Sequence, residues 1–296
     1  MSATNTRLAT WVRLISTFIL ISLIGWCSTN SYRNRQLGPM KAELMSLFME
    51  EGVMVSRSDT VTDVVKHASP ETLERVFYDA AGKATLPALK WLVENGVKPQ
   101  GIGKLKDLTL FQQAARNPQY DNMEYFLSLG LNPLERSRDG RTVLHVAAEG
   151  GVDQRTLTLL LAKGLKVSDV DDLGRTPIHY ANQKSVGSLA AAGAEIDAKD
   201  NRGVTALDLA AATGHEDVVK ELLNHSASVF TTDAKGRTPL HYAALNPNDA
   251  VVDALRDHGA PTAARDSEGF TPREVAQAQS ESNPGRGVSP NTLDKF

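Results

Sequence analysis

The sequence predicts an all-α protein built as a solenoid of helix-turn-helix repeats with β-turn or hairpin tips. Three observations indicate this fold class. A short phrase containing glycine, threonine and leucine returns along the chain at a spacing close to 33 residues. A second set of glycines advances in step with it. The 296 residues are 41% hydrophobic but only 6% aromatic, a composition that suits short helices packed closely through Ala and Leu.

The chain begins with an apolar segment that we exclude from the globular fold. Residues 14–27 read LISTFILISLIGWC, and counting back to Leu8 gives twenty residues, about the number that spans a ~30 Å hydrocarbon core. Arg13 lies close enough to one end to reach the interface, and Trp11 and Trp26 would lie at the two interfaces. We predict an N-terminal hydrophobic helix that acts as a signal anchor over residues 1–28, meets the membrane through residues 8–27 and is followed by a polar linker over 29–38.

Two other fates of this segment stay open. Cleavage after Cys27 would release a secreted or periplasmic protein, and lipidation of Cys27 would leave a lipid anchor. The second alternative resembles the bacterial lipoprotein box but departs from it at Trp26, where that pattern has a small residue. A short leader with Arg7 and Arg13 before an apolar run is typical of export signals, so we expect a bacterial protein with its repeats on the periplasmic side.

The repeat period is visible at two kinds of glycine. The turn glycines advance by 34, 29, 33 and 33 residues, at Gly140, Gly174, Gly203, Gly236 and Gly269. The glycines that close each second helix advance by 34, 34, 29, 33 and 33 residues, at Gly96, Gly130, Gly164, Gly193 and Gly259, with Ser226 replacing one of them. Because two landmarks advance together, we assign residues 69–279 to about five repeats with degenerate ends.

Each repeat opens with a phrase that starts a helix. Residues 238–244 read TPLHYAA and residues 176–181 read TPIHYA, with looser copies at Thr142 and Thr205. A threonine hydroxyl caps free amides, and proline is tolerated in the first turn. These motifs resemble the ankyrin family, whose repeat of about 33 residues is a β-turn and two antiparallel helices with a T-P-L-H-x-A pattern.

The repeat from Gly174 to Gly203 is four residues shorter than those after it. The loss falls between His179 and Gly193. Four residues are close to one helical turn of 3.6, so the remaining helices can keep their apolar faces inward. We expect a shorter helix pair and a local dent or change of curvature.

The two ends of the repeat region differ in character. Residues 39–68 are expected to form an N-terminal helical cap, with an amphipathic helix over 39–51 that places Leu44, Leu47 and Phe48 on one face. Another helix is expected to begin over Thr60 to His67. Residues 280–296 lack periodicity and have the Pro, Gly, Ser and Asn content of a disordered tail.

Composition and motifs argue against an enzyme, and against cofactor, metal, nucleic-acid or small-molecule partners. The formal net charge is -3 and the pI is near 6.2, so no overall basic character favours nucleic acid. The single cysteine, Cys27, precedes the repeats, which therefore contain no thiol ligand. His145, His179 and His241 recur at one position of successive repeats, separated by roughly a helix diameter of ~10 Å, which is too far for shared metal binding.

The recurring histidines and aspartates have structural explanations. The ankyrin resemblance implies that the histidines make hydrogen bonds at the turn. Aspartate side chains favour turns, which explains the residues that precede the turn glycines, Asp139, Asp171, Asp200, Asp233 and Asp266.

The resemblance implies a non-enzymatic scaffold or adaptor that binds a protein partner through the concave surface of hairpin tips and first helices. The alternative is an inhibitor or immunity-type protein that occludes another protein's active site. Arg141, Arg175 and Arg237 would form a basic ladder suited to an acidic partner, and Phe270 is the best single anchor because it is an aromatic residue at a tip. The expected partner-binding residues are Arg138, Arg141, Glu149, Leu173, Arg175, Val204, Thr213, Lys235, Arg237, Leu245 and Phe270.

Overall fold

The computed structural model describes residues 39–53, 61–102, 107–245, 248–282 and 295–296. Every element in these ranges is helical, which confirms the all-α prediction for this part of the chain. The predicted hydrophobic helix and linker, residues 1–38, lie outside the described residues. Within those ranges, no helix has both the length and the apolar character needed to cross a lipid bilayer.

The chain divides into two compact units, the first containing residues up to 76 together with 87–97. In this unit a helical segment over 39–50 buries Leu44, Leu47 and Phe48, so the predicted amphipathic helix is confirmed. Arg75 forms an ion pair of 2.8 Å with Glu51. The other helical elements that contribute to this unit are α2 (Val61–His67), α3 (Pro70–Ala81) and α4 (Leu86–Glu94).

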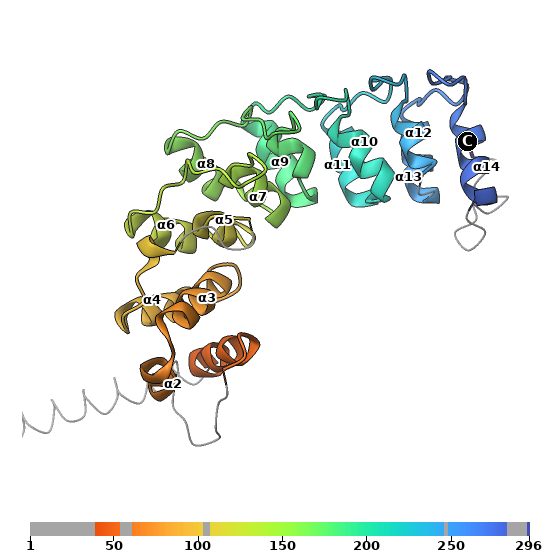
Figure 1. The fold of residues 1–296 in the computed structure, drawn as a ribbon. Coiled ribbons are helices and arrows are strands. Elements are labelled where there is room, and N and C mark those ends of the chain that lie inside the picture. Colours follow the sequence, from red (N-terminus) through yellow and green to blue (C-terminus); the bar gives the residue numbers. More distant parts are fainter. Residues whose placement is uncertain (1–38, 54–60, 103–106, 246–247, 283–294) are drawn as a thin grey trace, which may run out of the picture. The chain divides into compact units, whose positions relative to one another are not determined.

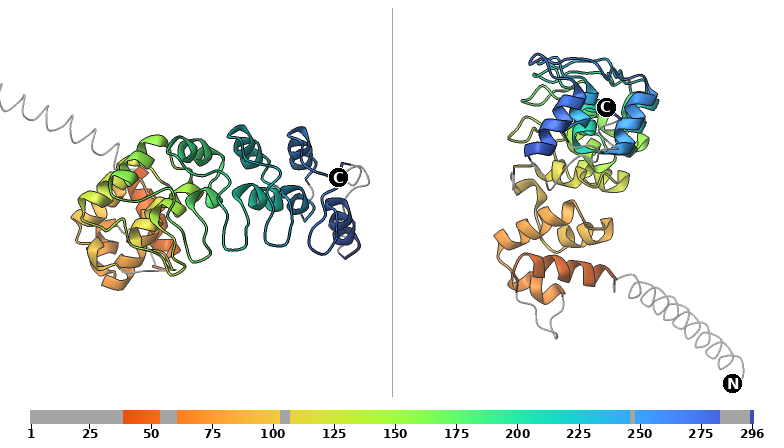
Figure 2. Two further views of the ribbon diagram at one scale, coloured as in Figure 1. Left: turned by 90° about the horizontal axis from the view of Figure 1, so that it is seen from above. Right: turned by 90° about the vertical axis from the view of Figure 1, so that its right-hand side faces the viewer.

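The second unit, residues 77–86 and 98–296, contains two rows of helices. The rows are visible in Figure 1, and the end-on view of Figure 2 separates them. First helices of successive repeats pack side by side in the inner row: α5 (Leu110–Ala115), α7 (Val143–Gly150), η2 (Pro177–Tyr180), α10 (Ala206–Thr213), α12 (Pro239–Ala243) and α14 (Pro272–Ser282). Second helices form the outer row: α6 (Tyr120–Ser128), α8 (Gln154–Ala162), α9 (Gln183–Ala191), α11 (Glu216–Asn224) and α13 (Asp249–Asp257). A short 3-10 turn, η1 (Pro99–Gly101), precedes α5.

Helix starts in the inner row follow the predicted threonine phrases. Thr142, Thr176, Thr205 and Thr238 are the N-cap residues of α7, η2, α10 and α12, and each forms a reciprocal capping box with the residue three positions later. This arrangement satisfies amides that would otherwise lack partners at the helix start.

The core between the rows consists of alanines and aliphatic residues. The inner row contributes alanines with little or no exposure, which let neighbouring helices approach closely, and the outer row contributes leucines and valines. Among the buried residues are Ala147, Ala148, Ala211, Ala243, Leu157, Leu160, Leu189 and Leu222. Each repeat thus buries its apolar surface against its neighbours, which makes the rows stable as an array.

The four missing residues are taken from one helix and not from both. In the short repeat the inner element η2 is a four-residue 3-10 turn where α7 and α10 have eight residues, while α9 keeps the nine residues of α8 and α11. The expectation of a shorter pair is therefore wrong for the outer helix. Asn182 explains the difference, because its side chain accepts a hydrogen bond from the Ser185 amide and starts α9 at once.

The last helix extends three residues into the segment 280–296 that the sequence predicts as a tail. Helix α14 reaches Ser282, so residues 280–282 are helical. Lys295 forms ion pairs with Asp253 at 2.5 Å and Asp249 at 3.3 Å, both on α13, and Phe296 is buried. The intervening residues 283–294 lie outside the described ranges.

Candidate protein-binding face

The hairpins between repeats are shaped by aspartate side chains. Oδ1 of Asp171 accepts hydrogen bonds of 2.9 Å from the amides of Leu173 and Arg175, and Asp200 and Asp233 repeat this pattern at their own turns. Asp266 repeats it at the last hairpin. These bonds confirm that the turn aspartates act structurally. Asp139 differs, because Ser137 occupies the equivalent position and donates to its side chain.

Neighbouring hairpins are joined by backbone hydrogen bonds. The amide of Asn201 donates to the carbonyl of Leu173 at 2.9 Å, and equivalent bonds link the other hairpins, from Asp172 to Asp139, Ala234 to Arg202 and Ser267 to Lys235. Gly174 has a φ of 75°, and a Cβ there would collide with Asn201. The hairpins therefore form a continuous, preformed edge along the array.

The histidines of the repeated phrase link each repeat to the next. Nδ1 of His145 accepts a hydrogen bond from the Thr142 amide at 3.1 Å, so Nε2 carries the proton and donates to the Arg175 carbonyl at 2.9 Å. His179 donates in the same way to Val204, and His241 to Phe270. Burial lowers the pKa of His145 and of His179, which favours this neutral form. Their role is structural, as predicted.

Asp208 occupies the histidine position of its repeat. Its Oδ2 accepts hydrogen bonds from the amide and hydroxyl of Thr205 at 2.8 and 2.9 Å. Its Oδ1 is buried without a hydrogen-bond partner in the described structure. Burial raises the pKa of Asp208 to about 6. This repeat therefore lacks the imidazole donor that the neighbouring repeats use.

The predicted basic ladder is largely neutralised. Arg141 pairs with Asp139 at 2.7 Å, Arg175 with Asp200 at 3.4 Å, and Arg237 with Asp233 at 2.7 Å. The three arginine side chains are only 21%, 18% and 29% exposed. The ladder is thus a set of ion pairs, and its contact with an acidic partner stays a prediction.

Two tyrosines complete these ion-pair clusters. Tyr180 donates to Asp171 at 2.6 Å, and its ring lies 5.7 Å from the Arg141 guanidinium and 5.9 Å from that of Arg175. Tyr242 donates to Asp233 at 2.8 Å and lies 4.6 Å from Arg237. Although burial opposes it, hydrogen bonds from Arg237 and Tyr242 lower the pKa of Asp233. Sequence reasoning missed these tyrosines, although each follows its arginine by five residues.

The remaining expected partner-binding residues fall into two groups. Apolar side chains are available at Leu173, Leu245 and Phe270, which are 53%, 39% and 45% exposed. Polar and charged side chains are exposed at Arg138, which pairs with Asp107, and at Glu149, Thr213 and Lys235. Val204 does not belong with them. It is 1% exposed and packs in the core, so its expected contact with a partner is wrong for this structure.

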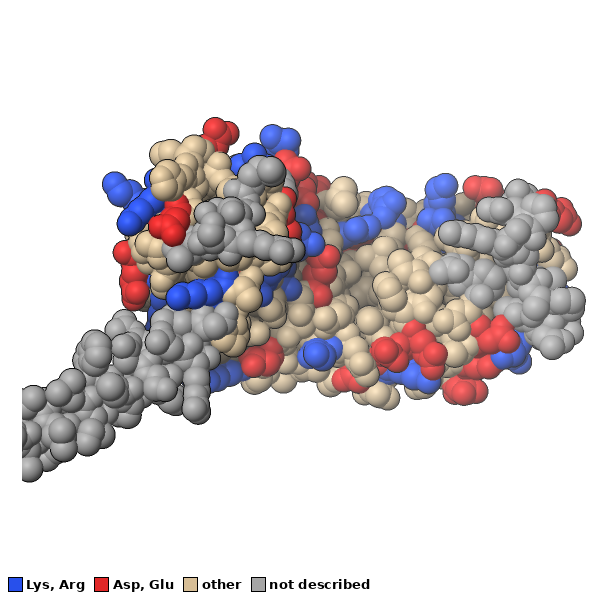
Figure 3. Space-filling model, turned by 90° about the horizontal axis from the view of Figure 1, so that it is seen from below, with Lys and Arg blue, Asp and Glu red and all other residues tan. Residues whose placement is uncertain are grey.

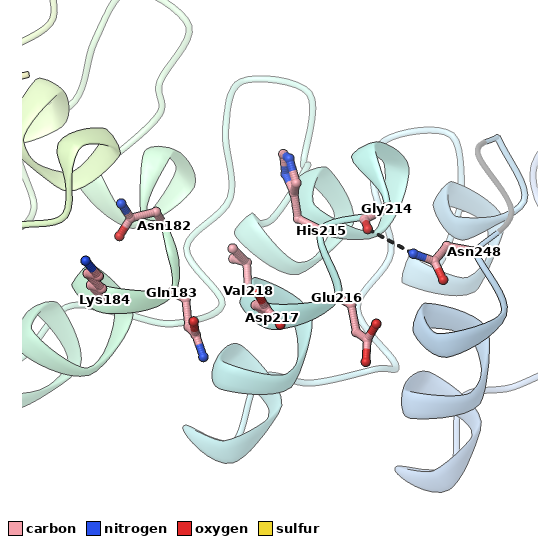
Figure 4. A pocket seen from close by; sticks show the side chains of 9 residues that line it. All are labelled: Asn182, Gln183, Lys184, Gly214, His215, Glu216, Asp217, Val218 and Asn248. Atoms are coloured by element: carbon pink, nitrogen blue, oxygen red, sulfur yellow. Dashed lines mark hydrogen bonds between the residues drawn. The ribbon is translucent and has the colours of Figure 1, made fainter.

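A notch interrupts the inner row at the short repeat. A hollow of about 400 Å³ opens where the last turn of a full inner helix would lie, and Glu149 of α7 and Thr213 of α10 stand among the residues that line it. Its floor is mainly apolar, formed by Ile178, Ala181, Ala206, Leu209, Ala210 and Val218. A second hollow of about 500 Å³ adjoins it through Asn182, His215 and Val218 (Figure 4).

Charged side chains lie on different helices around the second hollow. Lys184 comes from α9, while Glu216 and Asp217 come from α11 (Figure 4). Across the face drawn in Figure 3, charged side chains gather along the edges of the repeat unit, with a mostly uncharged band between them. Of the notch residues, sequence reasoning identified only Glu149 and Thr213. The six-residue spacing from Thr176 to Asn182, against ten from Thr205 to His215, is the signal that locates the rest.

Comparisons with known proteins agree with this architecture. A family model described as ankyrin repeats in three copies matches residues 110–200 and 182–266, which together span more than half of the 296 residues. A Caenorhabditis elegans transient receptor potential cation channel subfamily A member 1 homolog is 25% identical over 61% of this chain and 14% of its own length. The Drosophila melanogaster NF-kappa-B inhibitor cactus is 31% identical over 35% of this chain and 21% of its own.

A bacterial protein is also similar. Protein PhlB of Serratia liquefaciens is 35% identical over 36% of this chain and 48% of its own length. The chain therefore covers less than half of each of these three relatives. The matched residues contain the turn glycines from Gly140 to Gly236 and the helices of both rows from α5 to α13. The chain belongs to the ankyrin-repeat family.

Proposed function

We propose that this protein is a non-enzymatic scaffold that binds a protein partner through the hairpin edge and the inner row, here called the binding face. The observation that carries this proposal is the combination of a preformed backbone with exposed apolar side chains. Hydrogen bonds between hairpins hold the edge in place, so binding orders little backbone. Leu173, Leu245 and Phe270 supply apolar surface on it.

Membrane attachment is a separate part of the proposal. Residues 8–27 form an apolar stretch of suitable length, and we propose that they tether the repeats to a membrane, on the periplasmic side of a bacterial cell. Alkaline extraction of membranes tests this. The full chain is expected to stay in the membrane fraction, and a variant with Leu20→Asp and Leu23→Asp is expected to be extracted. Extraction of both would contradict the tether.

An inhibitor is the second candidate. One relative, cactus of Drosophila melanogaster, is named as an NF-kappa-B inhibitor, which supports this candidate. For the present chain, an inhibitor would use the same binding face. The two candidates differ in their effect on the partner: an inhibitor abolishes a measurable activity of its partner, and an adaptor does not.

The binding face is tested with a matched pair of phenylalanines. Phe270 adjoins the last hairpin, while Phe230, 64% exposed, lies in the loop after outer helix α11 near Gly259. The native full-length protein is recovered from mildly solubilised membranes and compared with Leu173→Ser/Phe270→Ser and with Phe230→Ser. The first variant is expected to lose the partner by at least about tenfold, and the control to retain it. Equal recovery by all three would show that the face is wrongly assigned.

The arginines are unsuitable for this test. Arg175 pairs with Asp200, whose side chain is only 1% exposed, so Arg175→Ala would remove one of the two arginines that pair with this buried carboxylate. If such a variant lost binding, the loss could come from lower stability or from a missing contact with the partner. Circular dichroism and thermal unfolding of the serine variants confirm that each remains folded before its binding is compared.

A further inference from the structure

The notch at the short repeat lies within the binding face. In the two flanking repeats the inner helix continues for another turn at this point, as α7 does up to Gly150 and α10 does up to Thr213. In the short repeat η2 ends at Tyr180, and Asn182 begins the outer helix. The missing turn would have lain between the C-terminal ends of α7 and α10. What remains there is the hollow of about 400 Å³.

The notch is held open by hydrogen bonds on its α7 side. The Asn182 amide donates to the Ala148 carbonyl at 3.1 Å, and its side-chain amide donates to the Glu149 carbonyl at 3.0 Å. The Ser185 hydroxyl donates to the same Ala148 carbonyl at 2.7 Å. These bonds satisfy the end of α7 without the missing turn. The short segment is therefore pinned to α7, and the neighbouring helices do not close over the gap.

The residues that line the notch are mainly apolar, so the notch favours an apolar side chain of a partner. Ile178, Ala206 and Ala210 are buried at its base, with exposures of 2%, 3% and 5%, and Leu209 and Val218 add half-buried aliphatic surface. The hollow is deep because two of these residues, Ala206 and Ala210, have small side chains. Its volume lies in the range of ordinary ligand pockets, and its walls come from elements whose positions are set by the capping boxes of Thr176 and Thr205.

The charged residues around the two hollows favour a basic side chain of the partner next to the apolar one. Three carboxylates line the two adjoining hollows, Glu149, Glu216 and Asp217, against a single amine, Lys184. Glu149 and Glu216 already pair with Arg141 at 3.7 Å and with Lys220 at 2.5 Å, so among the described residues Asp217 is the carboxylate of the three that forms no ion pair. Glu216 and Asp217 lie together on the α11 side, away from Lys184 on α9 (Figure 4). A cationic side chain is therefore attracted to the α11 side of the notch.

We propose that the notch is the anchor site of the binding face, and that it takes a bulky aliphatic side chain of a partner protein with a lysine or arginine next to it on the α11 side. This inference rests on the proposed protein-binding function and names the chemistry of the partner. The inserted side chain occupies the space of the missing helical turn. Glu149 and Thr213 stand at its two sides and contact the partner backbone.

The test selects peptides from a phage-displayed library of random linear peptides against the full chain. We expect the enriched peptides to share a Leu, Ile or Met adjacent to Lys or Arg. The principal variant inserts Ala-Ala-Thr-Gly, copied from residues 211–214, between Ala181 and Asn182, which fills the notch with the missing turn. The second variant, Thr213→Arg, blocks the mouth from an exposed position without altering the core.

Each notch variant is expected to weaken binding of the selected peptides about tenfold to a hundredfold, the effect of leaving one large aliphatic side chain in water. Glu216→Gln/Asp217→Asn is expected to reduce the preference for basic peptides. Enriched peptides without the aliphatic and basic pair, unchanged binding by a folded Thr213→Arg variant, or no enrichment at all would each overturn the inference.

The outcomes separate the notch from the wider proposal. Suppose that the natural partner is lost by Leu173→Ser/Phe270→Ser but bound normally by both notch variants. The scaffold function then stands and the notch inference fails. If the partner is retained by every one of these variants, the binding face itself is wrong.

Discussion

Asp208 provides a quantitative test of how one repeat joins the next. Its neighbours at this position, His179 and His241, donate to the following repeat, whereas Asp208 leaves Oδ1 without a partner in the described structure. Burial, together with the negative charge of Asp233, raises its pKa from 3.8 to about 6, while hydrogen bonds from Thr205 and the charge of Lys199 act in the opposite direction.

The sign of the resulting pH dependence follows from linkage. Because its folded-state pKa is raised, the folded protein binds this proton more tightly than the unfolded chain does. The contribution of Asp208 to stability is therefore most favourable below about pH 4 and declines as the pH rises toward about 6. A shift of about two pKa units, at ~1.4 kcal/mol each, lowers the free energy of unfolding by up to about 3 kcal/mol at neutral pH.

The perturbation is Asp208→Asn. Asparagine keeps the size of the side chain and an oxygen that accepts the two Thr205 hydrogen bonds, but it cannot ionise. Urea unfolding of both proteins, followed by circular dichroism, is compared at about pH 4 and about pH 7.5. Taking the difference between variant and parent cancels the titration of carboxyl groups that do not interact with Asp208, such as Asp200.

We subtract the free energy of unfolding of the parent from that of Asp208→Asn at each pH. This difference is expected to be about 2 to 3 kcal/mol more positive at about pH 7.5 than at about pH 4. A difference that stays constant over this range would refute the reasoning, because it would mean that Asp208 titrates alike in the folded and unfolded states.

Three further stability predictions follow from the repeats. Asp208→His restores the imidazole found in the neighbouring repeats and is expected to raise the melting temperature at neutral pH; a lower melting temperature would show that this site cannot hold the ring. Gly174→Ala is expected to destabilise more than Gly193→Ala in urea unfolding, because both glycines have positive φ but only at Gly174 does a Cβ meet another residue. At Gly193 the strained backbone alone costs about 1 kcal/mol, and equal losses would contradict the collision. Leu160→Ala removes a side chain with 0% exposure and is expected to cost about 2 to 5 kcal/mol, whereas a loss below about 1 kcal/mol would argue against a packed core there.

Local chemistry explains why much of the fold was predictable. The threonine phrases specify helix starts through capping, and the turn glycines specify left-handed backbone at fixed intervals, so both could be located from residue types alone. The structural roles of His145 and of the turn aspartates followed from the same repetition. Each of these features depends on residues that lie close together in the sequence or that recur in every repeat.

The less predictable features depend on contacts between repeats. The sequence shows that four residues are missing, but it does not show which helix loses them. The inner helix loses them because Asn182 caps the start of α9 and its side chain donates to the Glu149 carbonyl of α7. Val204 occupies the repeat position of Arg141 and Arg175, which predicts an exposed side chain, but it is 1% exposed, whereas Phe270 at the same position is 45% exposed. The neutralisation of the arginines depended on carboxylates whose placement only the folded hairpins define.

The central claim is that a protein partner contacts the hairpin edge and the inner row. Photo-crosslinking tests it most directly, with a photoreactive phenylalanine analogue placed at position 270 or 245, or at control position 230, in the full-length protein in intact cells. The account predicts adducts with one specific protein from positions 270 and 245 and none from position 230. Adducts from position 230 alone, or the same adducts from all three positions, would contradict it.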